Sequence, residues 1–110
     1  MKELELFFEK QINEHQLIVE RSKSLLMDSF LATVKICIDS LKDKKKLLYF
    51  GNGGSASDAQ HLATELSVRF SKDRRAISAI SLVTDTSALS AIGNDFGFEF
   101  LFSRQIEAIG

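Results

Sequence analysis

Two side chains that could bind a metal ion, His61 and Glu65, lie four residues apart in the segment QHLATEL. Residues i and i+4 of a helix lie on one face, so an imidazole nitrogen and a carboxylate oxygen would point the same way. Zinc accepts both ligand types, and a carboxylate can also act as a general base. A simple surface hydrogen bond is the alternative, because zinc needs three or four ligands. His15 has no metal-spaced partner, so no third ligand is evident.

A glycine-rich turn, with the sequence GNGGSA from Gly51 to Ala56, precedes this helix. Glycines let backbone N–H groups approach a ligand closely, and the N-terminus of a helix favours negative charge. Ser55 and Ser57 add hydroxyl groups, so the turn predicts binding of a phosphate or of sugar hydroxyls. It is not a Walker A loop, because no lysine follows it. It matches the loose dinucleotide pattern G-x-G-x-x-A, but Asp85 comes too late to be the acidic residue of that pattern. A tight turn without a ligand remains the alternative.

The elements that must position these residues alternate between helix and strand. Residues 2–42 lack glycine and proline and carry an apolar stripe at helical spacing, as one long helix or as two with a break near Met27–Asp28. Two short apolar runs have the pattern of strands buried on both faces. We expect strands at 47–50 and 77–83, helices at 55–70, 87–92 and 98–109, and polar turns or loops at 42–46, 51–54, 71–75, 84–87 and 93–98.

This order predicts an α/β domain with a parallel sheet flanked by helices. Two parallel strands make a poor core, since both faces of such a sheet need cover and its edges need partners. We therefore expect an incomplete domain, with further strands supplied by a longer protein or by another chain. Residues 46–110 are expected to form the start of the parallel-sheet core. Residues 1–45 are expected to form a helical region whose apolar stripe either packs on its own domain or serves as an oligomerisation region, because periodicity shows an apolar face but not its partner.

Composition limits the class of protein. The 110 residues are 45% apolar and 26% charged, with a formal net charge of −1, which suits one globular domain. No apolar run is long enough to span a membrane, and the charged N-terminus is unlike a signal peptide. The single cysteine, Cys37, is flanked by isoleucines and predicts a buried thiol in a reducing cytoplasm. The near-neutral charge argues against a nucleic-acid partner.

Three stretches together resemble the phosphoheptose isomerases of the sugar-isomerase (SIS) domain superfamily. They are FGNGGSASDAQHLATEL from Phe50, then Arg69–Phe70, then LVTDTSALSAIGNDFGFEFLFSRQIEAIG from Leu82. The resemblance is dense from about residue 47 to residue 110 and weaker over the N-terminal helices. Chains of this family are nearly twice as long, so the resemblance covers about their N-terminal half. It implies the SIS fold, a three-layer α/β sandwich with long N-terminal helices.

The resemblance also implies roles for individual residues. Glu65 matches the family's catalytic base, and His61 and Glu65 match its two N-terminal zinc ligands. The expected substrate-binding residues, which include the catalytic base, are Asn52, Gly53, Gly54, Ser55, Glu65, Arg69, Asp85, Asn94 and Asp95. The remaining zinc ligands, the phosphate-binding serine loop and a second catalytic histidine belong to the C-terminal half of the family.

The implied reaction converts sedoheptulose 7-phosphate to D-glycero-D-manno-heptose 7-phosphate through an enediolate, for the synthesis of heptose precursors of lipopolysaccharide. The implied assembly is a cytoplasmic homotetramer with active sites at subunit boundaries. The alternative is a non-catalytic SIS protein that binds a replication initiator or senses a sugar phosphate. The sensor would need the glycine turn but not Glu65. The presence of both His61 and Glu65, beside the two substrate-binding turns, favours the enzyme over the initiator-binding protein.

Overall fold

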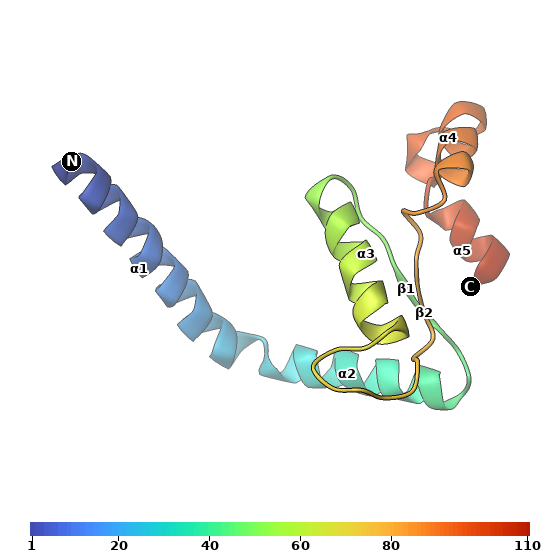
Figure 1. Cartoon of the computed structure of the whole chain (residues 1–110), viewed down its shortest axis with the longest axis horizontal. Coiled ribbons are helices and arrows are strands. Elements are labelled where there is room, and N and C mark those ends of the chain that lie inside the picture. The colour runs from blue at the N-terminus through green and yellow to red at the C-terminus, as the bar shows by residue number, and fades with distance from the viewer. The chain divides into compact units, whose positions relative to one another are not determined.

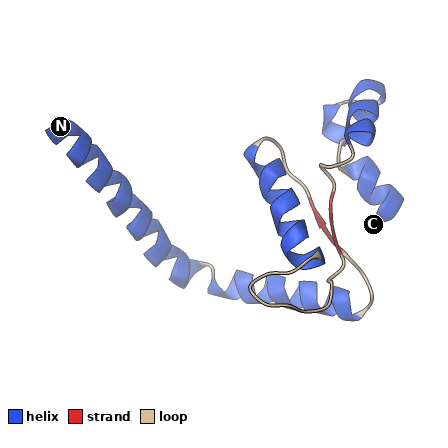
Figure 2. Ribbon diagram, viewed as in Figure 1, coloured by secondary structure: helices blue, strands red, loops and turns tan.

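The computed structural model describes residues 1–110, which divide into two compact units, Met1–Ile36 and Cys37–Gly110. Figure 1 labels the elements, and Figure 2 separates the helices from the two short strands. No helix is long and apolar enough to cross a membrane.

The N-terminal unit is helical. Helix α1 (Lys2–Leu25) ends at Leu26, whose N–H still donates to the Ser22 carbonyl at 3.0 Å, and α2 (Met27–Lys42) begins at the next residue. The sequence therefore forms two helices, with the break one residue before the predicted position. Helix α2 continues across the boundary between the two units.

A two-stranded parallel sheet lies in the second unit. Strand β1 (Leu47–Tyr49) pairs with β2 (Ala79–Ser81), with Leu47 opposite Ala79, and the pairing continues as the Leu82 N–H donates to the Tyr49 carbonyl at 2.9 Å. Strand β1 is followed by the glycine turn, and β2 by the segment that starts the next helix. Because the strands are parallel, both connections leave from the same edge of the sheet, where α/β proteins commonly bind ligands.

Helix α3 (Gly54–Ser67) packs against both strands. Its two buried residues, Ala59 and Ala63, are small and four positions apart, so one face of the helix can approach the sheet closely. The most deeply buried side chain is Leu82, directly after β2, with 1% of its surface exposed. The opposite side of α3 is left for His61 and neighbouring polar residues.

The chain ends in three short helical elements: α4 (Thr86–Asp95), a 3₁₀ turn η1 (Phe98–Phe100) and α5 (Ser103–Ile109). The Gln105 side-chain amide on α5 donates to the Leu82 carbonyl at 3.0 Å, and the Phe50 and Phe102 rings lie 4.9 Å apart. These contacts fix the end of the chain to the sheet through side chains.

Several predicted elements need correction. The helix predicted at 98–109 is a 3₁₀ turn followed by α5, and the loop predicted at 93–98 begins inside α4, which ends at Asp95. The predicted second strand at 77–83 shrinks to three residues because a strand extends only as far as its partner pairs with it. The predicted burial of both strands on two faces is also wrong, since every residue of β1 is half-buried, and in β2 only Ser81 is buried while Ile80 is exposed. The thiol of Cys37, predicted to be buried, is half-buried.

Candidate functional site

The glycine turn shapes the start of α3. Gly53 caps the helix with a φ of 58°, a conformation that favours glycine, and its carbonyl accepts from the Ala56 N–H at 3.0 Å. At Gly51 a β-carbon would lie 2.6 Å from the Ser55 β-carbon, so the close approach of the turn to the helix requires glycine there. Asn52, Gly53, Gly54 and Ser55 are all exposed, which leaves the turn open to a ligand.

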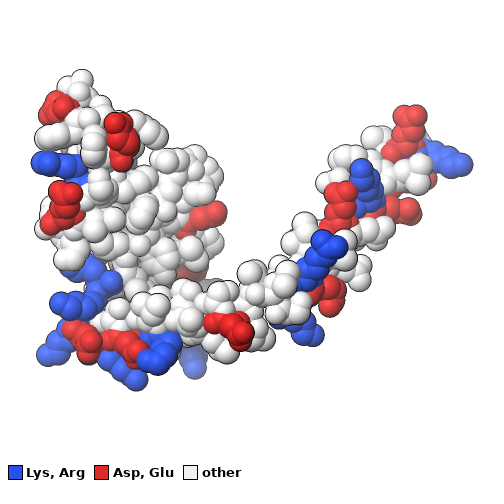
Figure 3. Space-filling view, turned by 180° about the vertical axis from the view of Figure 1, so that it is seen from behind, with Lys and Arg blue, Asp and Glu red and all other residues white.

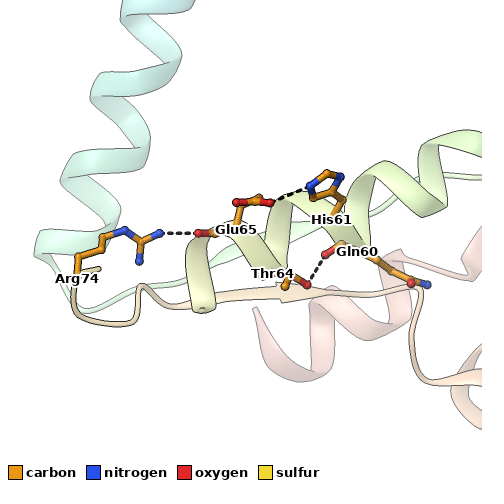
Figure 4. A network of polar contacts seen from close by, with 5 residues as sticks. All are labelled: Gln60, His61, Thr64, Glu65 and Arg74. Carbon is orange, nitrogen blue, oxygen red and sulfur yellow. Dashed lines mark hydrogen bonds and ion pairs between the residues drawn. The ribbon is translucent and has the colours of Figure 1, made fainter. Parts of the chain in front are cut away.

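His61 and Glu65 face one another on α3, as their spacing predicts. The distance between His61 Nε2 and Glu65 Oε1 is 2.8 Å, and Figure 4 shows both side chains on one side of the helix. The imidazole is 74% exposed, whereas the carboxylate side chain is 31% exposed. The second carboxylate oxygen of Glu65 accepts no hydrogen bond within the chain, so it remains available as a hydrogen-bond acceptor.

Two pockets of about 360 Å³ each lie along this part of α3. Leu62, Glu65 and Phe70 line both of them, so the Glu65 carboxylate borders two pockets. The first pocket is completed by Asp58 and His61. The second pocket is completed by residues outside the predicted site, namely Tyr49, Leu66 and Arg74.

Tyr49 is the chain's one tyrosine, at the end of β1. Burial, and to a smaller extent the Cys37 thiol, raises the pKa of the Tyr49 phenol above its ordinary value of 10.0. The phenol is therefore neutral at physiological pH, so the second pocket contains a hydroxyl group besides the Glu65 carboxylate.

The pair of His61 and Glu65 suits zinc in ligand type and separation. Two donors bound to a tetrahedral zinc at ordinary bond lengths lie roughly 3.3 Å apart, so the observed 2.8 Å needs only a small opening. No group of three or more histidine, cysteine, aspartate or glutamate side chains in the chain could hold a metal ion together. His61 and Glu65 are therefore two donors of suitable type, without a third metal-binding side chain grouped with them.

The other predicted site residues do not line these two pockets. Arg69 lies just beyond α3 and is exposed. Asp85 caps the start of α4, where its carboxylate accepts from the Ala88 N–H at 2.9 Å. At the other end of α4, the Asn94 amide donates to the Asp95 carboxylate at 2.9 Å. Nine residues of helical rise, about 14 Å, separate Asp85 from Asn94.

The sequence prediction missed Arg74, which was assigned to a polar loop. In the structure its guanidinium donates to the main-chain carbonyl of Glu65, near the end of α3 (Figure 4). It also donates to the carbonyl of the next residue, Leu66. Cationic side chains near the C-terminus of a helix commonly bind its last carbonyls, and this signal could have singled out an arginine in the following loop.

The family model of the SIS domain matches residues 10–108. The chain belongs to the SIS domain family. It is 55% identical over 102 residues to phosphoheptose isomerase 1 of Campylobacter jejuni, a match that covers 93% of this chain and 54% of that protein. It is 49% identical over 104 residues to the phosphoheptose isomerase of Paramagnetospirillum magneticum, covering 94% of this chain and 54% of the relative.

Solved structures agree with the sequence comparison. The phosphoheptose isomerase of Neisseria gonorrhoeae has a TM-score of 0.86 and 36% identity, and the match covers 97% of this chain and 55% of that chain. The enzyme of Francisella tularensis also has a TM-score of 0.86, at 29% identity. The predicted SIS-type fold and the resemblance to the phosphoheptose isomerases are confirmed. The chain spans about half the length of the curated relatives that it matches.

Proposed function

We propose that this chain forms part of the active site of an aldose–ketose isomerase that interconverts sedoheptulose 7-phosphate and D-glycero-D-manno-heptose 7-phosphate. The main support is the pair of His61 and Glu65, held 2.8 Å apart beside a pocket, on the same helix that the open glycine turn begins. Two relatives named phosphoheptose isomerase, which are 55% and 49% identical to this chain, support the same reaction. A sugar-phosphate sensor would need the turn alone, so the pair favours the enzyme over the non-catalytic alternative.

In this mechanism Glu65 is the base. Its carboxylate takes the proton from C1 of the ketose, the electron pair forms the C1–C2 double bond, and the C2 carbonyl oxygen becomes the enediolate oxygen. A proton then passes from the C1 hydroxyl to the C2 oxygen. Return of the abstracted proton from Glu65 to C2, with formation of the C1 carbonyl, gives the aldose. One positioned base contributes about 10²–10⁴-fold to the rate, so electrostatic stabilisation of the enediolate is also needed.

The remaining residues have binding roles in this proposal. His61 and Glu65 would bind zinc together with further ligands, and zinc would supply polarisation of the substrate carbonyl. Asn52, Gly53, Gly54 and Ser55 would hold the substrate through backbone N–H and polar side-chain groups. The other substrate-binding residues in the proposal are Arg69, Asp85, Asn94 and Asp95.

We place the protein in the cytoplasm as a homotetramer that supplies heptose precursors for lipopolysaccharide. The free thiol of Cys37 supports a reducing compartment. The exposed apolar stripe of α1 supports assembly, because large apolar surfaces are commonly covered by a partner.

The test measures isomerisation of sedoheptulose 7-phosphate by the protein purified in the form that its source organism makes. We expect conversion of sedoheptulose 7-phosphate to the aldose, loss of conversion after removal of metal with a chelator, and recovery on addition of zinc. Nuclear magnetic resonance of the sugar measures the conversion directly. Binding of sedoheptulose 7-phosphate without conversion, in metal-loaded protein, would contradict the enzyme and favour the sensor.

A further inference from the structure

Arg74 connects the loop after α3 back to the helix turn that carries Glu65. Its Nη2 donates to the Glu65 carbonyl at 2.5 Å, and its Nη1 donates to the Leu66 carbonyl at 2.9 Å. Nη1 also donates to the Arg75 carbonyl at 3.0 Å, which ties the guanidinium to its own loop. Arg74 is half-buried and lines the second pocket together with Glu65. Figure 4 shows the guanidinium at the carbonyl of Glu65 and the carboxylate of the same residue at His61.

The main-chain carbonyls at the end of α3 accept hydrogen bonds from different donors. The last four carbonyls of a helix have no amide partner within it. The Thr64 carbonyl accepts from the Val68 N–H at 2.9 Å, and the Leu66 carbonyl accepts from the Ile77 N–H at 3.0 Å as well as from Arg74. The Glu65 carbonyl accepts from Arg74 alone. Arg74 therefore supplies the hydrogen bond that no backbone group provides.

Glu65 lies only two residues before the end of α3, so its backbone is in the part of a helix that frays most readily. The direction of a side chain follows from the backbone conformation of its residue. A guanidinium that holds the Glu65 carbonyl in helical geometry therefore also holds its carboxylate toward His61. Its charge lies at the negative end of the helix dipole, which adds to the interaction.

We propose that Arg74 is a positioning residue for Glu65, acting through the main-chain carbonyl of Glu65 and not through its carboxylate. This inference rests on the proposed base role of Glu65. Arginine suits the task because its fork of N–H donors reaches two successive carbonyls at once, whereas lysine presents a single point charge. Displacement of a catalytic group by about 1 Å can lower a rate by roughly 10²-fold.

The test compares Arg74→Met with Arg75→Met in the protein as its source organism makes it. The two changes remove the same charge from adjacent positions, but the Arg75 side chain makes no hydrogen bond or ion pair within the chain. For Arg74→Met we expect kcat to fall about 10–100-fold, with KM for sedoheptulose 7-phosphate changed less than about threefold. We expect Arg75→Met to keep the wild-type values, and Arg74→Lys to fall between them.

Two further readouts separate positioning from a general loss of stability. Amide hydrogen exchange of Val68, whose N–H closes the last turn of α3, should speed up at least tenfold in Arg74→Met and stay unchanged in Arg75→Met. Zinc affinity per folded molecule, measured by calorimetry, should fall in Arg74→Met alone. If Arg74→Met does not fold, Arg74→Lys is compared with Arg75→Lys in the same way.

Equal kcat, zinc affinity and exchange in the Arg74 and Arg75 variants would overturn the positioning role. A lower melting temperature with unchanged kcat per folded molecule would overturn it too, because it would leave Arg74 with a structural role only. An inactive wild-type protein would instead contradict the proposed function, and the exchange of Val68 would still decide whether Arg74 holds the end of α3.

Discussion

The two units of the chain treat their apolar residues differently. In Cys37–Gly110, four apolar side chains are buried, among them Leu82 with 1% of its surface exposed. In Met1–Ile36, no residue of α1 is buried, and Phe8 is 65% exposed. Figure 3 shows the basic and acidic side chains distributed along the N-terminal helices, with uncharged surface between them. The second unit therefore builds a small core of its own, whereas α1 presents an apolar face that its own unit does not cover.

The two units show what helical periodicity predicts and what it leaves open. A helical apolar stripe predicts that a face will be buried, but it does not identify the partner. In α3 the partner is the sheet, which needs the small residues Ala59 and Ala63 for close contact. The stripe of α1 has no partner within its unit, in agreement with the proposed assembly of several chains.

The largest effect on stability is expected from Leu82→Ala. This change removes a fully buried side chain between β2 and its neighbours and leaves a cavity, so the free energy of unfolding should fall by about 2–5 kcal/mol. Denaturation with urea at several protein concentrations measures the loss, which should be the same at each. A loss below about 1 kcal/mol would mean that Leu82 is not the centre of the core of this unit.

A smaller effect, on assembly instead of folding, is expected from Phe8→Ser on α1. If α1 packs against other copies of the chain, removal of an exposed ring from its apolar face should weaken association by about tenfold or more. Light scattering at micromolar concentration measures the mass of the assembly, with Glu9→Ser as the neighbouring control. A wild-type protein that is monomeric under these conditions would contradict the proposed tetramer.

Much of the fold follows from local sequence patterns. The apolar stripe predicted the N-terminal helices, the glycine turn predicted the connection from β1 to α3, and the alternation of elements predicted a parallel sheet. The predicted bounds of an element were wrong where contacts with other segments determine its length. The second strand is shorter than predicted because strand length depends on pairing with β1, and the segment after Phe98 divides into η1 and α5.

In the candidate site, too, local patterns predicted some features, whereas others depend on contacts between distant segments. Helical periodicity alone placed His61 and Glu65 on one face, and the structure confirms it at 2.8 Å. A cation after a helix end could be noticed in the sequence, but the choice between Arg74 and Arg75 could not be made there, because it depends on how the loop folds back onto the helix end nine residues earlier. The roles of Asp85 and Asn94 as substrate ligands stay predictions, since within the chain both side chains bind neighbouring groups of α4.

Glu65 is proposed as the base of an isomerase, and Glu65→Gln tests this role. The control is Glu107→Gln on α5, which removes an equivalent charge from an exposed side chain without a hydrogen bond. In the protein as its source organism makes it, with zinc content measured for each variant, we expect Glu65→Gln to lower kcat by about 10²–10⁴-fold or more. Calorimetry should still detect binding of sedoheptulose 7-phosphate, and Glu107→Gln should match the wild type. Near-normal turnover by Glu65→Gln would contradict the account.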